Sequence, residues 1–136
     1  MSTPAQVGPL ARNLTWVQTP AAGVENLEPG VVASPVVLTN MARVFAPAIT
    51  ETAMGMLLCL TRGITRLYMP QFAKRQMNPV GTAKSPDHVE LAGRTMGIVG
   101  MGGIGSALAR RAHYGFDMRI VATDARGVAT VTLNRP

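Results

Sequence analysis

The sequence predicts an α/β protein built on parallel sheets, and three observations lead to this class. Short apolar or β-branched runs alternate with longer helical patterns along the 136 residues. A glycine-rich stretch, MGIVGMGGIG at 96–105, stands where one of these runs gives way to a helical pattern. Hydrophobic residues make up 47% of the chain, which is enough for a buried core. We therefore expect open sheets of parallel strands flanked by helices.

The first half of the chain contains two predicted strands and the clearest helix. We expect strands at 14–18 and 36–39, the second so uniformly apolar that both of its faces should be buried. From 46 to 67, apolar residues recur at spacings of three and four, which predicts a helix with Pro47 in its first turn. Residues 68–88 lose this pattern and contain prolines and basic residues, so we predict a basic connecting loop.

The second half reads as strand, helix and strand. We predict a strand at 95–100 and a helix at 104–114, with Gly115 as the glycine that caps the helix C-terminus. A further strand is expected at 118–123, and Asp124 stands at its end. This order is a βαβ unit, whose two strands are expected to be parallel.

The glycines between the strand and the helix fit the pattern G-x-G-x-x-G at Gly100, Gly102 and Gly105. In this pattern the first glycine permits a tight turn and the second lets a pyrophosphate approach the backbone. The third lets the helix and the strand pack closely. The amides of Gly102, Gly103 and Ile104 are then expected at the positive end of a helix, where anions bind. These residues predict a dinucleotide-binding loop.

An acid completes this pattern. Asp124 follows Gly105 by 19 residues, close to the ~20 expected of an acid that accepts hydrogen bonds from the adenosine ribose. An acid at this point favours NAD, because it would repel the 2′-phosphate of NADP. Arg126, two residues later, leaves NADP open. The alternative is a generic glycine-rich turn followed by an incidental strand-end Asp.

Composition narrows the classes of partner. Basic residues outnumber acidic ones 13 to 7, for a net charge of +6, but aromatic residues are only 4%. We therefore expect no nucleic-acid partner of the kind that needs basic and aromatic residues together. The single cysteine, Cys59, excludes an internal disulfide. The apolar runs are too short for a membrane span and no signal peptide is evident, so we expect a cytoplasmic protein.

Three segments in a fixed order resemble the D-isomer-specific 2-hydroxyacid dehydrogenases, the family that includes phosphoglycerate and glyoxylate dehydrogenases. LAGRTMGIVGMGGIG resembles the family's entry to the nucleotide-binding loop, and WVQTPAAGVENL resembles its substrate loop. VVLTNMARVFAPAITETAMGMLLCLTR resembles its strand leading into the interdomain helix. The combination is more specific than the glycines alone.

The resemblance implies partial Rossmann-like sheets and a division of the chain into parts of two domains. Residues 1–88 would be part of the substrate domain, with the interdomain helix at 46–67 and the connecting loop at 68–88. Residues 89–126 would be the first βαβ unit of the NAD-binding domain, and 127–136 a tail outside the family pattern.

The resemblance also implies a function, namely NAD-dependent oxidoreduction of the CH–OH group of D-2-hydroxy acids, with hydride transfer between the nicotinamide and the substrate. Ala22 and Gly23 match the loop whose backbone amides hold the carboxylate of the small 2-hydroxy or 2-oxo acid. Read without the resemblance, the same residues fit an ordinary turn. Gly100, Gly102, Gly103, Ile104, Gly105 and Asp124 match the cofactor positions. The interdomain helix is expected to form a homodimer.

The family's catalytic His, its paired Glu and its substrate Arg are expected after the first βαβ unit, so we assign no catalytic residue and no metal site. His88 and His113 are not expected to substitute for the catalytic base. We therefore expect a fragment with a partial NAD site and no activity alone. The alternatives are a non-catalytic NAD-binding or oligomerising module and a nonfunctional truncated or fused gene product.

The last ten residues, GVATVTLNRP, resemble the first strand of enoyl-CoA hydratase proteins. We favour a junction near Arg126 with an unrelated gene product over an unusual third strand of the nucleotide domain.

Overall fold

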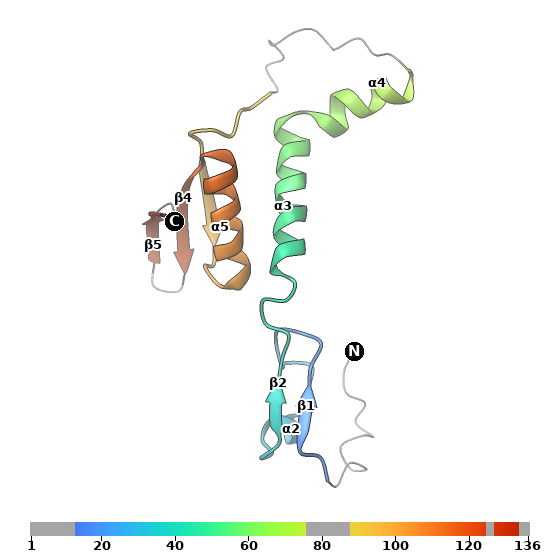
Figure 1. Ribbon diagram of the computed structural model, residues 1–136, viewed down its shortest axis with the longest axis vertical. Helices are drawn as coiled ribbons and strands as arrows, with labels where there is room; N and C mark the ends of the chain where they lie inside the picture. Colours follow the sequence, from blue (N-terminus) through green and yellow to red (C-terminus); the bar gives the residue numbers. More distant parts are fainter. Residues whose placement is uncertain (1–12, 76–87, 125–126, 134–136) are drawn as a thin grey trace. The chain divides into compact units, whose positions relative to one another are not determined.

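The computed structural model describes residues 13–75, 88–124 and 127–133 of the chain. These residues fall into two compact units, Met1–Phe45 and Ala46–Pro136, and each is described by itself (Figure 1).

The first unit is built on two short parallel strands, β1 (Trp16–Gln18) and β2 (Val37–Thr39). A short helix, α2 (Pro29–Val32), lies between them in the chain and carries a proline in its first turn, where the missing N–H costs nothing. The Trp16 indole N–H donates to the Thr39 hydroxyl at 2.9 Å and ties the two strands together. Val37 is 60% exposed, so the expectation that this strand is buried on both faces is wrong for the described unit.

The second unit opens with a helix that ends earlier than the sequence pattern predicts. Helix α3 (Ala46–Thr61) is followed by Gly63 in the left-handed region, with φ at +63°. The chain continues as a π-helical turn, η1 (Ile64–Tyr68), and a short helix, α4 (Met69–Ala73). The predicted helix at 46–67 is therefore broken at Gly63, where the apolar spacing continues but the backbone leaves the α-helical path. The predicted loop at 68–88 is helical at its start, and its residues 76–87 lie outside the described chain.

A three-stranded sheet forms the rest of this unit. Its order is β3 (Thr95–Val99), β4 (Arg119–Asp124) and β5 (Gly127–Val131). Strands β3 and β4 are parallel, with Val99 opposite Thr123, as expected of a βαβ unit. Strand β5 returns antiparallel, with Gly127 opposite Asp124. The residues predicted as a tail thus complete the sheet as a hairpin.

Helix α5 (Gly103–Phe116) connects β3 to β4 and packs against both strands and against α3 (Figure 1). It extends one residue past Gly115, and its cap is Asp117, whose φ is +51°. The prediction of Gly115 as the capping glycine is therefore wrong, because Asp117 adopts the left-handed conformation that aspartate tolerates.

The apolar core lies between the inner face of the sheet, α5 and α3. Its buried members are Met54, Leu91, Ile98, Ala109, Ala112, Met118, Ile120 and Ala122. Ala109 and Ala112 have no exposed surface, so small side chains on α5 let the helix lie close to the sheet. Within the described ranges, no helix has both the length and the apolar character needed to cross a bilayer.

Candidate cofactor and substrate loops

The glycine-rich loop begins where β3 ends, and Gly100 fixes its direction. The Gly100 amide donates to the Thr123 carbonyl at 2.7 Å, which ties the loop to the carboxyl end of β4. Gly100 has a φ of +91°, a conformation that residues with a Cβ rarely adopt. The tight turn that the first glycine of the pattern predicts is therefore present.

The third glycine of the pattern lies against the first. A Cβ on Gly105 would collide with the carbonyl oxygen of Gly100 and would lie 3.3 Å from the Ile98 side chain. Gly105 is buried in the first turn of α5. Only a residue without a side chain lets this helix start so close to the end of β3, as the sequence pattern predicts.

The second glycine stands at the helix start and faces open space. Gly102 is the N-cap of α5, and among the described residues no side chain caps this end. A Cβ on Gly102 would meet nothing within 4 Å. The first-turn amides, including those of Gly103 and Ile104, therefore have no partner from within the helix and lie at its positive end. Such an end can bind a phosphate or another anion.

The predicted ribose-binding acid follows β4 at the same edge of the sheet. Asp124 is the last residue of β4, directly after the Thr123 whose carbonyl accepts the bond from Gly100. The parallel pairing of β3 and β4 places their carboxyl ends side by side, so the structure brings the backbone of Asp124 to the edge that carries the glycine loop. Its pairing with Gly127 shows that the chain reverses immediately afterwards.

The predicted substrate loop belongs to the first unit and follows β1. Thr19 is buried, and its hydroxyl accepts a hydrogen bond from the Ala21 amide at 3.2 Å. The Ala21 carbonyl accepts from the Met41 amide at 3.1 Å. The Ala22 carbonyl accepts from the Asn40 side-chain amide at 2.7 Å. The loop is thus held from three sides by residues that flank β1 and β2.

Two backbone amides of this loop, those of Ala22 and Gly23, donate to no acceptor among the described residues. The Glu25 carboxylate lies where a Cβ on Gly23 would be, so glycine leaves room for a carboxylate against the backbone at this point. Two adjacent free amides can bind an anion of this kind.

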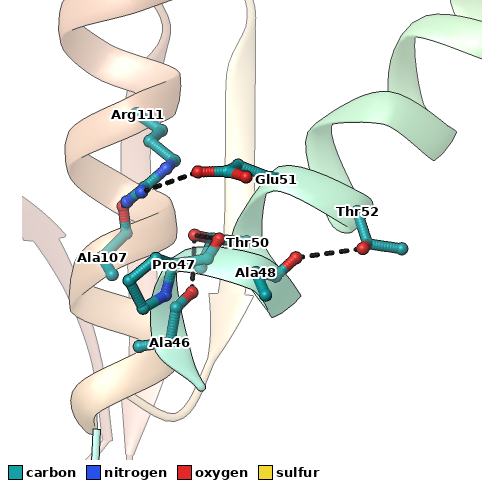
Figure 2. A network of polar contacts seen from close by, with 8 residues as sticks. All are labelled: Ala46, Pro47, Ala48, Thr50, Glu51, Thr52, Ala107 and Arg111. Atoms are coloured by element: carbon teal, nitrogen blue, oxygen red, sulfur yellow. Dashed lines mark hydrogen bonds and ion pairs between the residues drawn. The ribbon is translucent and has the colours of Figure 1, made fainter. Parts of the chain in front are cut away.

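Among the described residues, the ion pair between Arg111 and Glu51 joins α5 to α3, and the other contacts in Figure 2 lie within one helix. The Arg111 guanidinium lies 3.6 Å from the Glu51 carboxylate, and both side chains are substantially exposed. Thr50 is fully buried, and its hydroxyl donates to the carbonyls of Ala46 and Pro47 at 2.7 and 3.0 Å. These contacts are structural, because each joins protein groups in the first two turns of α3 to one another or to α5.

The two histidines lie in the second unit, away from the glycine loop in sequence and contacts. His88 stacks on Tyr68, with ring centroids 5.9 Å apart. His113 lies near the end of α5, where its Nδ1 is 2.9 Å from the Met118 carbonyl oxygen. Both rings are engaged by the fold.

Sequence reasoning missed Asn40 and Thr19, the two side chains that hold the predicted substrate loop. A signal for them existed, since each directly follows a strand and each can bond a backbone two residues on. Asn40 uses this ability, because its side-chain oxygen accepts from the Ala42 amide at 3.2 Å.

The sequence model of a known family matches residues 54–135, more than half of the chain. That model is described as the D-isomer specific 2-hydroxyacid dehydrogenase, NAD binding domain. The chain belongs to this family. The resemblance expected from the three sequence segments is therefore confirmed, as is the partial Rossmann-like fold.

Individual members of the dehydrogenase family are similar to this chain in sequence and in structure. A glyoxylate/hydroxypyruvate reductase B from Salmonella paratyphi B is 33% identical over 109 residues, covering 79% of this chain and 33% of its own. A solved family protein from Aeromonas salmonicida is 32% identical with a TM-score of 0.67, covering 88% of this chain and 37% of its own. A D-lactate dehydrogenase structure from Treponema pallidum is 25% identical with a TM-score of 0.68, covering 99% and 38%. The chain thus spans about a third of the length of the curated relatives it matches.

The family match runs to residue 135 and so includes nearly all of the ten residues that resemble an enoyl-CoA hydratase strand. Nothing in the comparisons supports that second resemblance. The domain boundary expected near residue 88 remains a prediction.

Proposed function

We propose that the chain forms part of an NAD-dependent D-2-hydroxyacid dehydrogenase and binds NAD through the loop that starts α5. The observation that carries this proposal is the start of α5, where no described side chain caps the first-turn amides and a Cβ on Gly102 would meet nothing within 4 Å. The amides of Gly102, Gly103 and Ile104 would hold the pyrophosphate. Asp124 would accept hydrogen bonds from the ribose hydroxyls and favour NAD over NADP.

We propose that Ala22 and Gly23 hold the carboxylate of a small 2-hydroxy or 2-oxo acid. Support comes from the two amides that the described residues leave free and from the lack of a side chain at Gly23, which lets the Glu25 carboxylate lie against the backbone there. The nicotinamide of bound NAD would accept or donate the hydride. The chain's own loops would bind and orient the two reactants.

Calorimetric titration of the 136-residue chain with NAD tests the cofactor proposal. We expect binding, a weaker response to NADP, and about a tenfold loss of NAD affinity in Asp124→Ala, the loss typical of a hydrogen bond to a charged group. Glu90→Ala removes an exposed carboxylate from the same unit and is the matched control. Equal affinity of the wild type and Asp124→Ala for NAD would contradict the assigned role of Asp124.

An assay with several D-2-hydroxy acids, run on the same sample, separates the proposed function from its alternatives. We expect NAD binding without turnover, because the family resemblance places the general base after the first βαβ unit and we do not expect His88 or His113 to substitute for it. Turnover would contradict this expectation. A folded chain that ignores NAD would contradict the cofactor site, and a chain that does not fold would favour a nonfunctional gene product.

We also propose that α3 forms a homodimer interface. Its exposed face carries an apolar stripe of Ile49, Met56 and Leu60, the last of which is 75% exposed. Uncharged side chains at this spacing suit burial against a second helix. In sedimentation velocity runs we expect a dimer for the wild type and a monomer for Leu60→Glu. Val37→Glu changes an equally apolar exposed residue of the first unit and should remain dimeric.

A further inference from the structure

In the loop after β1, hydrogen bonds hold two consecutive peptide groups by their carbonyl oxygens. The Ala21 carbonyl accepts from the Met41 amide, and the Ala22 carbonyl accepts from the Asn40 side chain. In a trans peptide the N–H points opposite to the C=O, and the described chain contains no cis peptide. The amides of Ala22 and Gly23 must therefore point away from residues 40 and 41.

We infer that Asn40 is a positioning residue, which aims the Gly23 amide at the substrate carboxylate, while the Met41 amide holds the preceding peptide. The inference rests on the proposed substrate loop and adds a residue that acts through the backbone rather than on the substrate. Its physical basis is a single 2.7 Å hydrogen bond that fixes the plane of the Ala22–Gly23 peptide.

Asn40 is suited to this task because it uses both ends of its side-chain amide. The nitrogen donates to the Ala22 carbonyl, while the oxygen accepts from the Ala42 amide at 3.2 Å. The second bond forms a turn directly after β2 and holds the side chain at the strand end. The Ala22–Gly23 peptide is thereby attached to the end of the neighbouring strand.

Glycine at position 23 makes this control necessary. Without a side chain, Gly23 has a wide choice of backbone conformations, so its amide is not directed by local sterics. The Thr19 hydroxyl accepts a hydrogen bond from the Ala21 amide and so constrains the part of the loop that precedes Gly23. Asn40 constrains the Ala22–Gly23 peptide, and the two amides that remain as donors point away from residues 40 and 41.

The variant Asn40→Asp isolates the donor, because a carboxylate can still accept from the Ala42 amide but cannot donate to the Ala22 carbonyl. Asn40→Ala removes both bonds. Asn26→Asp adds the same charge to an exposed position of the same loop and is the matched control. The indole signal of Trp16, the single tryptophan, reports whether the β1–β2 pair remains folded.

The decisive experiment compares ¹H–¹⁵N spectra of the ligand-free 136-residue chains. We expect the Ala22 and Gly23 amide signals to shift or broaden in Asn40→Asp and in Asn40→Ala, with the Trp16 signal unchanged. The Ala42 signal should move in Asn40→Ala more than in Asn40→Asp. Wild-type positions for Ala22 and Gly23 in both variants would overturn the inference.

Titration of the same samples with glyoxylate, the smallest 2-oxo acid, tests the proposed loop separately. We expect the Ala22 and Gly23 signals of the wild type to move on titration. Affinity should fall about fivefold in Asn40→Asp, the loss expected for one hydrogen bond, and stay unchanged in Asn26→Asp. If the ligand-free signals move as expected but the wild type ignores glyoxylate, the substrate loop is wrong and the orientation by Asn40 stands.

Discussion

Both units place backbone amides of a loop at the carboxyl end of a parallel strand, but different groups orient these amides. In the second unit, the start of α5 supplies them, and the contact between Gly100 and Gly105 sets their position. In the first unit, side chains that flank the strands, Thr19 and Asn40, hold the loop. One loop therefore depends on the absence of side chains and the other on their presence.

The same two units differ in how they are stabilised. Among the described residues of the first unit, the buried side chain is that of Thr19, a polar residue. The second unit has a continuous apolar core that joins the sheet to α5 and α3. The first unit thus depends mainly on hydrogen bonds, whereas burial of apolar surface stabilises the second.

The largest expected effect tests this difference in stability. Ile120 in β4 is only 2% exposed, so Ile120→Ala should lower the free energy of unfolding by about 2–5 kcal/mol. Val37→Ala in β2 is the control, because this side chain is already 60% exposed and should lose little. Urea unfolding followed by circular dichroism measures both. Equal losses of unfolding free energy in the two variants would mean that apolar packing stabilises the first unit as much as the second.

The second prediction concerns the glycine contact. Gly105→Ala puts a Cβ against the Gly100 carbonyl, which the bond from Gly100 to Thr123 prevents from moving easily. We expect a loss of about 1–3 kcal/mol, as for other overpacked sites, together with weaker NAD binding. Thermal unfolding and calorimetry provide the two measurements. Gly97→Ala, where a Cβ meets nothing within 4 Å, should leave NAD affinity unchanged.

The third prediction removes a hydrogen bond on which the first unit depends. Thr39→Val keeps the side-chain shape but eliminates both the acceptor for the Trp16 indole and the hydroxyl that donates to the Gln18 side chain. We expect a loss of about 1 kcal/mol and a shift in Trp16 fluorescence. Because the donor is exposed to water, a loss well above this value would point to additional strain between β1 and β2.

The smallest effect is expected at the ion pair between α3 and α5. Glu51→Gln should change the free energy of unfolding by less than about 1 kcal/mol, since the Glu51 side chain is 71% exposed. The small loss should disappear in high salt. A salt-independent loss would indicate that Glu51 contributes by packing rather than by charge.

The parts of the fold with a strict local pattern could be predicted from the sequence. The glycine loop follows from positions whose backbone geometry only glycine accommodates, as Gly100 and Gly105 illustrate. The end of α3 could not be predicted in the same way. Apolar spacing continues past Gly63, where the backbone adopts the left-handed conformation and a Cβ would meet the side chains of Leu67 and His88.

The glycines of the candidate site could be predicted from the sequence, but the side chains that hold the substrate loop could not. Ala22 and Gly23 stand out because a glycine loop follows a strand. Asn40 lies 18 residues from Ala22 along the chain, and its partner becomes evident only when β1 and β2 pair. Hydrogen bonds between distant segments of this kind leave no periodic signal in a single sequence.

Because β5 runs antiparallel to β4, its last residues lie at the opposite end of the sheet from the glycine loop. Val131 pairs with Ile120 near the start of β4, whereas Gly100 and Asp124 mark the opposite edge. A dye or a surface tether attached at Leu133 would consequently lie toward the end of the sheet opposite the glycine loop. Chains immobilised through this position should leave that loop open to solution for sensor-based titrations.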